Sequence, residues 1–154
     1  MRRLAVLVCS FGYVGFFPIA PGTAGSAAGV VLYVALHWLG AAYLDLPLVV
    51  VLFALGVWLG SAAEQALGSI DPGPVVIDEV MGMLLTLVLM PINWIGIALG
   101  FVIFRALDVV KPYPAGRFER LPGGLGMMAD DAMAAVYANL LLRAACYLAP
   151  ALVS

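Results

Sequence analysis

The stretch that decides how this chain folds runs from Gly100 to Asp131 and reads GFVIFRALDVVKPYPAGRFERLPGGLGMMADD. It begins in an apolar run, passes through a basic loop and a glycine-rich turn, and ends on two adjacent aspartates before another apolar run. Charged residues make up only 10% of the sequence, yet they crowd together here. An ionisable side chain against hydrocarbon costs about 3 kcal/mol even on the lower estimates, so this cluster indicates a functional site.

The composition around this stretch predicts an integral membrane protein. Apolar residues make up 65% of the 154 residues, and the mean hydropathy is +1.12. Ordinary soluble domains contain about 45–50% apolar residues. The length predicts a single domain over residues 1–154. A net charge of −2 and the lack of a lysine- or arginine-rich tract argue against a nucleic-acid partner.

The N-terminal region combines a short apolar run with a proline- and glycine-rich loop. Residues 4–17 are fewer than the ~20 that cross a bilayer, which favours an interfacial helix that is retained rather than cleaved as a signal peptide. The loop at residues 18–26 reads PIAPGTAGS. Thr23 or Ser26 is expected either to cap the following helix or to donate a hydrogen bond to an anion at its N-terminus.

Apolar runs predict the remaining helices. A run ending at Pro91 is short for a span and is followed at once by a second run, so the pair reads as a helical hairpin that returns to the side it left. Two Gly-x3-Gly pairs predict small-residue faces, for packing within one chain or between copies. The fold class is therefore an all-α, polytopic membrane helical bundle with a short helical hairpin and an interfacial N-terminal helix. The predicted segments are spans at 26–43, 48–67 and 129–148, and the hairpin at about 78–90 and 94–110.

Charge places the cluster on the cytoplasmic side of a multi-pass protein. Arg2 and Arg3 predict a cytoplasmic N-terminus, and the basic loop at residues 111–120 is expected on the same side. Counting crossings from there brings eight charged residues to one membrane level. These are Glu64, Asp78, Glu79, Arg105, Asp108, Lys111, Asp130 and Asp131.

The cluster contains more acids than bases, which favours a metal ion. Carboxylates that lie close together repel one another unless positive charge lies between them. Salt bridges to Arg105 and Lys111 are one solution, and a hard divalent cation such as Mg²⁺, which takes oxygen ligands, is the other. With only two cations available, Mg²⁺ is the favoured prediction. The predicted ligands and catalytic carboxylates are Asp78, Glu79, Asp108, Asp130 and Asp131.

A Mg²⁺ site flanked by cations suits phosphate chemistry, because metal and cations stabilise charge on the phosphoryl oxygens. Arg105 and Lys111 are the predicted phosphate-binding residues, with Thr23 and Ser26 as further donors. Other phosphatase designs are disfavoured because the sequence lacks a Cys-x5-Arg loop and an Asp-x-Asp-x-Thr/Val motif, and its only histidine, His37, lies outside the cluster.

Four motifs occur in a fixed order: PIAPGTAGS at 18–26, IDEVMGM at 77–83, FRALDVVKPYP at 104–114 and GGLGMMADD at 123–131. In these motifs the sequence resembles the phosphatidylglycerophosphatase A family of bacterial membrane phosphatases. The resemblance implies Mg²⁺-dependent removal of the terminal phosphate from phosphatidylglycerophosphate, giving phosphatidylglycerol. It also implies a phospholipid partner and a site on the cytoplasmic face of the bacterial inner membrane.

Two other functions fit parts of the sequence. A cation-coupled membrane transporter would also carry intramembrane acids and a broken helix, but the charges here lie at one surface. A lipid phosphotransferase of the CDP-alcohol type ranks last, because its DG-x2-AR-x8-G-x3-D-x3-D spacing is absent. The number of metal ions, the nucleophile, the oligomeric state and the selectivity among lipid phosphates stay open at the level of sequence.

Overall fold

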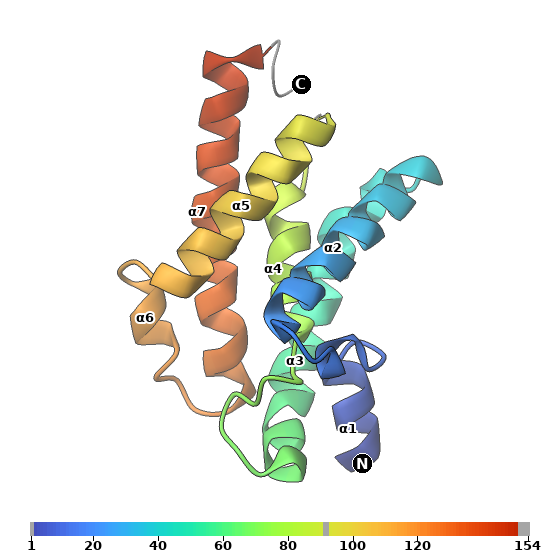
Figure 1. Ribbon diagram of the computed structural model, residues 1–154, viewed down its shortest axis with the longest axis vertical. Coiled ribbons are helices and arrows are strands. Elements are labelled where there is room, and N and C mark those ends of the chain that lie inside the picture. The colour runs from blue at the N-terminus through green and yellow to red at the C-terminus, as the bar shows by residue number, and fades with distance from the viewer. Residues whose placement is uncertain (1, 91–92, 151–154) are drawn as a thin grey trace.

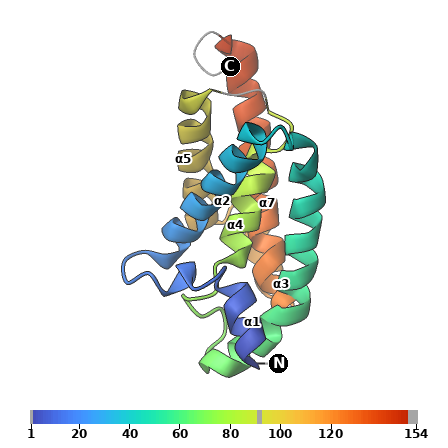
Figure 2. The ribbon, with the colours of Figure 1, turned by 90° about the vertical axis from the view of Figure 1, so that its right-hand side faces the viewer.

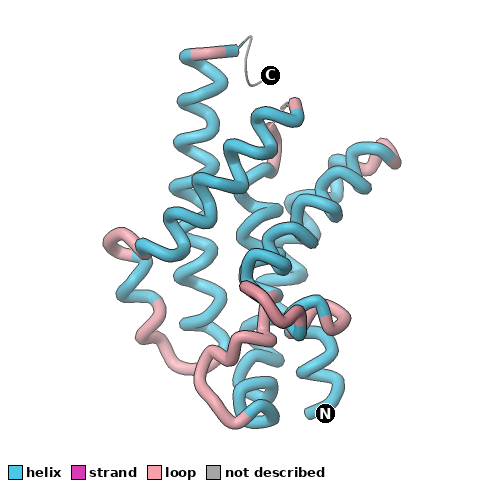
Figure 3. Tube along the Cα trace, in the orientation of Figure 1, coloured by secondary structure: helices cyan, strands magenta, loops and turns pink. Residues whose placement is uncertain are grey.

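The computed structural model describes residues 2–90 and 93–150. Within these ranges the chain forms helices and connecting loops and no strand (Figure 3), which confirms the all-α prediction. The α-helices are α1 (Arg2–Cys9), α2 (Pro21–Trp38), α3 (Asp45–Leu67), α4 (Ile77–Leu87), α5 (Trp94–Val110), α6 (Ala115–Phe118) and α7 (Gly124–Leu148). Two short 3-10 helices are η1 (Val14–Phe16) and η2 (Ala42–Leu44).

Helix α4 occupies the centre of the bundle. It packs against α2, α3, α5 and α7 (Figures 1 and 2), and its residues are almost all buried. Figure 1 shows α5 ending near mid-height beside α7, above the level at which α7 begins. The N-terminal end of α4 and the C-terminal end of α5 therefore lie beside the first turns of α7.

Glycines allow the helices to approach closely. A Cβ atom at Gly29 of α2 would lie 2.7 Å from the Cβ of Met83 in α4. One at Gly60 of α3 would lie 2.7 Å from the Cα of Gly124 in α7. Both distances are too short for real atoms, so the small-residue faces predicted from the two Gly-x3-Gly pairs are used for packing within the chain.

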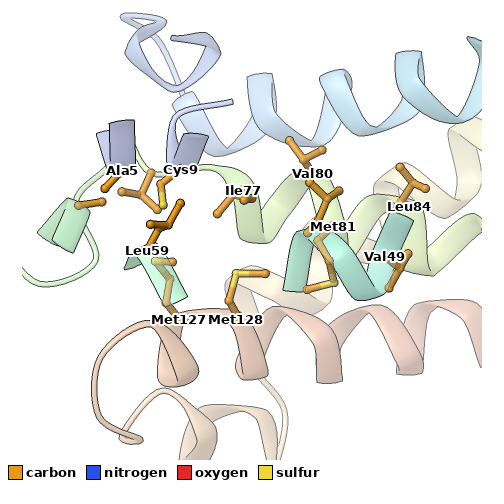
Figure 4. Packing of buried hydrophobic residues seen from close by; sticks show 13 residues of the cluster. Ala5, Cys9, Val49, Leu59, Ile77, Val80, Met81, Leu84, Met127 and Met128 are labelled. Atoms are coloured by element: carbon orange, nitrogen blue, oxygen red, sulfur yellow. The ribbon is translucent and has the colours of Figure 1, made fainter. Parts of the chain in front are cut away.

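Two apolar clusters hold the helices together. Figure 4 shows the first, in which Met81 of α4, Leu59 of α3 and Met128 of α7 lie among side chains that also reach α1. The second surrounds Phe104 of α5, whose ring lies 2.5 Å from the position of a Cβ at Gly82 of α4. These contacts fix α4, α5 and α7 directly beside the charged residues at their ends.

The first two helices differ from the prediction in their bounds. The N-terminal helix ends at Cys9, because Phe11 and Tyr13 adopt left-handed backbone conformations, with φ of 48° and 71°. Helix α2 begins at Pro21, five residues before the predicted span, so PGTAGS forms its first turns. Its N-cap is Ala20, without a side-chain cap, and the prediction that Thr23 or Ser26 caps this helix is wrong.

The predicted hairpin is present and shorter than expected. Helix α4 ends at Leu87, and its 11 residues span about 17 Å, well below the ~30 Å of a bilayer core. Figure 1 shows α5 returning toward the level at which α4 begins. Pro91, at which the sequence predicted the end of the first arm, lies outside the described residues.

Two helical segments of the described chain have the length and composition of membrane spans, Ala42–Leu67 and Gly124–Leu148. The predicted span at 26–43 is not among them. The 18 residues of α2 include PGTAGS, whose small and polar residues lower its apolar content. The structure therefore supports two of the three predicted spans by length and composition.

Candidate metal- and phosphate-binding site

Three carboxylates from two helices converge at the end of the bundle where α4 and α7 begin. Asp78 and Glu79 lie in the first turn of α4, and Asp131 lies two turns into α7. One oxygen from each of the three lies within 4.8 Å of the others. Asp78 and Asp131 are 6% and 4% exposed. This is the spacing of ligands around one cation.

Two oxygens in this group are buried without a hydrogen-bond partner. They are Oε2 of Glu79 and Oδ2 of Asp131. Asp78 accepts a hydrogen bond from the Glu79 backbone N–H at 3.0 Å. Buried polar atoms in folded proteins are nearly always paired, so the two oxygens call for a positively charged partner. A hard cation such as Mg²⁺, which binds carboxylate oxygens, fits this donor set.

Asp108 joins the acidic group to Arg105. The two residues lie one turn apart on α5, and Arg105 Nη1 donates to Asp108 Oδ2 at 2.6 Å. The side chains of Asp108 and Asp131 also lie within hydrogen-bonding reach of each other. The structure thus brings Asp108 next to the three converging acids, as the sequence predicted.

The first turn of α2 lies against this group. A Cβ at Gly22 would collide with Glu79 Oε1 and would lie 3.1 Å from Arg105 Nη2. Ser26 is buried, with its Oγ 3.5 Å from Arg105 Nη1, and it donates to the Gly22 carbonyl. Thr23 is exposed on the same turn. The Thr23 and Ala24 N–H groups donate to the Ala20 carbonyl, so the positive end of the helix dipole is what favours an anion here.

Lys111 and Asp130 form a separate ion pair beside the group. Lys111 follows the last residue of α5, and its Nζ lies 2.5 Å from Asp130 Oδ2 and 3.4 Å from Glu119 Oε1. Burial disfavours the ammonium, but the hydrogen bond and negative charge of Asp130, together with Glu119, raise the pKa of Lys111 above its ordinary value. Asp130, predicted as a metal ligand, is thus paired with Lys111 and is not one of the three converging acids.

Burial changes the acidity of Glu79. Helix α4 is too short to cross a bilayer, and Glu79 lies at its beginning. Burial raises the pKa of Glu79 to about 7; the hydrogen bond with Asp78 opposes this shift, and the charges of Asp131 and Asp108 reinforce it. The ionised carboxylates therefore repel one another unless a cation lies between them. The excess of acids over bases in the sequence pointed to the same conclusion.

Sequence reasoning missed the role of Gly22 and the second partner of Lys111. Gly22 was visible only as part of a glycine-rich loop, and its contact with Glu79 depends on how α2 crosses α4. Glu119 lies in a basic loop whose path the sequence does not reveal. A charged residue eight positions from Lys111 was the one available signal.

Comparison with known proteins identifies the family. The sequence model of phosphatidylglycerophosphatase A matches residues 7–146. The chain belongs to the phosphatidylglycerophosphatase A family. It is 40% identical over 133 residues to phosphatidylglycerophosphatase A of Escherichia coli, covering 85% of this chain and 76% of the relative. The Haemophilus influenzae protein of the same name is 37% identical over 149 residues, covering 96% and 91%.

A third relative carries a different name. A Bacteroides thetaiotaomicron protein, provisionally named phosphatidylinositol-3-phosphatase, is 37% identical over 139 residues, covering 85% of this chain and 86% of the relative. No solved structure gives a significant match. The family assignment confirms the predicted enzyme class, a phosphoric monoester hydrolase, and favours it over the transporter and the phosphotransferase. The bacterial relatives and the two apolar segments indicate membrane association.

Proposed function

We propose that the protein removes the terminal phosphate of phosphatidylglycerophosphate in a Mg²⁺-dependent reaction, giving phosphatidylglycerol and phosphate. Family membership supports the substrate. The observation that carries the metal dependence is the convergence of Asp78, Glu79 and Asp131 with two buried, unpartnered oxygens. Two cations, Arg105 and Lys111, lie beside these acids, as a phosphate site requires.

The three converging acids are the proposed ligands of the ion. Asp108, which lies beside Asp131 and is held by Arg105, orients the group from α5. Asp130 belongs to the site through Lys111, whose ammonium it positions. A bound Mg²⁺ would supply Lewis acidity, lowering the energy of the negative charge that builds up on the phosphoryl oxygens.

The phosphate is held from two sides. Arg105 offers planar N–H donors, of which Nη1 already pairs with Asp108, and Lys111 adds a compact positive charge. The first turn of α2 supplies the exposed Thr23 hydroxyl as a further donor at a helix N-terminus. Ser26, whose hydroxyl donates to the Gly22 carbonyl, lies 3.5 Å from Arg105 Nη1 and supports that guanidinium. Arg105 and Glu79 both lie against Gly22 of α2, so the phosphate would meet donors and metal ligands at the same place.

Hydrolysis breaks the bond between phosphorus and the glycerol oxygen of the lipid and forms one between phosphorus and an attacking oxygen. With water as the nucleophile, its proton passes to a site carboxylate, and a proton returns to the glycerol oxygen that leaves as an alcohol. Asp78, Glu79, Asp108 and Asp131 are the carboxylates that surround this position. Because phosphoryl transfer depends mainly on positioning and charge, small displacements of these residues have large kinetic effects.

The proposal places one multi-pass domain, residues 1–154, in the bacterial inner membrane with the site facing the cytoplasm. Arg2, Arg3 and the loop around Arg117 and Arg120 favour that orientation. The acidic group lies at the end of the bundle where the apolar segment Gly124–Leu148 begins, near the level expected for lipid head groups.

The test is phosphate release by the purified protein in non-ionic detergent. Substrates are phosphatidylglycerophosphate and phosphatidylinositol 3-phosphate at equal surface concentration, each with Mg²⁺ and with excess chelator. We expect release from phosphatidylglycerophosphate that stops in chelator and returns with added Mg²⁺. Release that continues unchanged in chelator would contradict the metal dependence. A preference for the inositol lipid would contradict the proposed substrate and leave the phosphatase class intact.

A further inference from the structure

A large pocket lies far from the acidic group. It has a volume of about 890 Å³ and opens between the end of α2, the beginning of α3, the end of α4 and the beginning of α5. In Figure 1 α2 and α4 end and α5 begins in the upper part of the molecule. The walls are mostly apolar and aromatic, with Tyr33, Trp38, Trp94 and Ile97 among them. The pocket is therefore separate from the proposed phosphatase site.

Asp45 supplies the single acidic side chain of this lining. It is only 2% exposed, and its Oδ1 is buried without a hydrogen-bond partner. The His37 ring lies beside it, with its Nε2 3.7 Å from Asp45 Oδ2, beyond hydrogen-bonding distance. Asp45 is the first residue of α3 and lies near the start of the apolar segment Ala42–Leu67.

Hydrogen bonds and ring stacking near Asp45 hold the aromatic side chains of the pocket in place. The Tyr33 hydroxyl donates to the Met90 carbonyl at 2.9 Å, and the Tyr33 ring stacks against His37 with 4.0 Å between centroids. His37 Nδ1 lies 3.0 Å from the Tyr33 carbonyl oxygen. These contacts hold two rings beside a carboxylate that has one buried oxygen without a hydrogen-bond partner.

The residues that line the pocket indicate which class of ligand it would bind. An ionised carboxylate only accepts hydrogen bonds, so its partner must be a cation or a strong donor. A divalent metal is disfavoured, because the described residues bring three metal-ligating groups together only at Asp78, Glu79 and Asp131. Aromatic faces attract organic ammonium groups, and the volume lies within the ~300–1,000 Å³ of small-molecule pockets.

We propose that this pocket binds an organic ammonium ion carried on an apolar body, with Asp45 as its counter-ion. The same chemistry occurs in two sources, an amine-bearing phospholipid head group and a soluble amphiphilic amine. The proposal does not depend on phosphatase activity, and its test uses binding alone.

The test is calorimetric titration of the purified full-length protein in non-ionic detergent with benzyltrimethylammonium and with benzyl alcohol, a neutral analogue. We expect the cation to bind at least about tenfold more tightly than the alcohol, as expected for a desolvated ammonium against aromatic rings and a carboxylate. Asp45→Asn should remove that preference, and Asp45→Glu should keep it. Asp71→Asn, which removes an equal charge from the exposed loop after α3, should bind like the wild type.

Equal binding of cation and alcohol by the wild-type protein would overturn the proposal. Undiminished cation binding by folded Asp45→Asn would do the same. If Asp45→Asn does not fold, the wild-type comparison still decides. The source is then identified by titrating the probe into nanodiscs of phosphatidylglycerol with and without phosphatidylethanolamine. Weaker probe binding in the presence of phosphatidylethanolamine would identify the lipid head group as the ligand. Unchanged binding would identify a soluble amine as the ligand.

Discussion

The two ends of this helical bundle each bury a carboxylate oxygen without a partner, but their surroundings differ. At one end Asp131 meets Asp78 and Glu79, with Arg105 beside them. At the other end Asp45 faces aromatic rings and has no second acid in its pocket. Several converging carboxylates match a divalent ion, whereas one carboxylate among rings matches an organic cation. The neighbours of a buried acid, rather than its burial alone, determine which cation it is expected to bind.

The largest effect is expected from removing one of the converging acids. Asp131→Asn keeps the shape of the side chain and removes a proposed ligand with its charge. Phosphate release should fall by at least about 100-fold, because even indirect metal partners cost 10–100-fold. Circular dichroism and size-exclusion chromatography check that the variant folds. Near-normal turnover by Asp131→Asn would remove this residue from the site.

Gly22→Ala tests how closely α2 approaches the acids. The added methyl group would collide with Glu79 Oε1 and press on Arg105, so both must move. We expect phosphate release to fall about 100-fold, the size of a 1 Å misplacement of catalytic groups. Gly73→Ala is the matched control, because its Cβ would make only an ordinary 3.6 Å contact with Pro21. Equal activity of the two variants would show that the close approach of α2 at Gly22 does not contribute to phosphate release.

Arg105 tests phosphate binding. Arg105→Met removes the donors beside Asp108 and Ser26, and we expect a loss of about 100-fold, as for other donors to a developing oxyanion. Arg105→Lys keeps the charge but not the planar donor pair, so its loss should be smaller, about tenfold. Steady-state kinetics on micelles of defined substrate content measures both. Equal losses in the two variants would show that geometry, not charge, is the main contribution.

The smallest effects are expected at the Lys111 ion pairs. Asp130→Asn weakens the buried 2.5 Å pair with Lys111, and release should fall about tenfold through loss of positioning. Glu119→Gln weakens the 3.4 Å pair, whose acid is 55% exposed, and should change release less than about twofold, as is usual for surface pairs. A loss at Asp130 as large as that at Asp131 would instead make Asp130 a direct ligand.

Much of the fold was predictable because apolar runs and motif order define the helices. The runs ending near Leu67 and Val110 gave helices close to their predicted positions. The start of α2 was misjudged, because proline is compatible with the first turn of a helix and the loop composition suggested otherwise. The left-handed residues after Cys9 that end α1 include two aromatic residues, which carry no sequence signal for such a conformation.

The site was predictable in its residue types but not in every role. The i, i+3 spacing predicted that Arg105 and Asp108 share a helix face, and they form an ion pair. The adjacent acids Asp130 and Asp131 point about 100° apart on a helix, so only one can face α4. The packing of α7 against α3 and α4 decides which one, and a single sequence does not specify that rotation.

Direct titration with Mg²⁺ tests the central claim, that the acids of α4 and α7 form a divalent cation site. Isothermal titration would compare wild type, Asp131→Asn and Asp45→Asn, each purified in the same non-ionic detergent. We predict that Asp131→Asn weakens Mg²⁺ binding by at least about tenfold, whereas Asp45→Asn binds Mg²⁺ like the wild type. Equal Mg²⁺ affinity of the wild type and folded Asp131→Asn would contradict the claim.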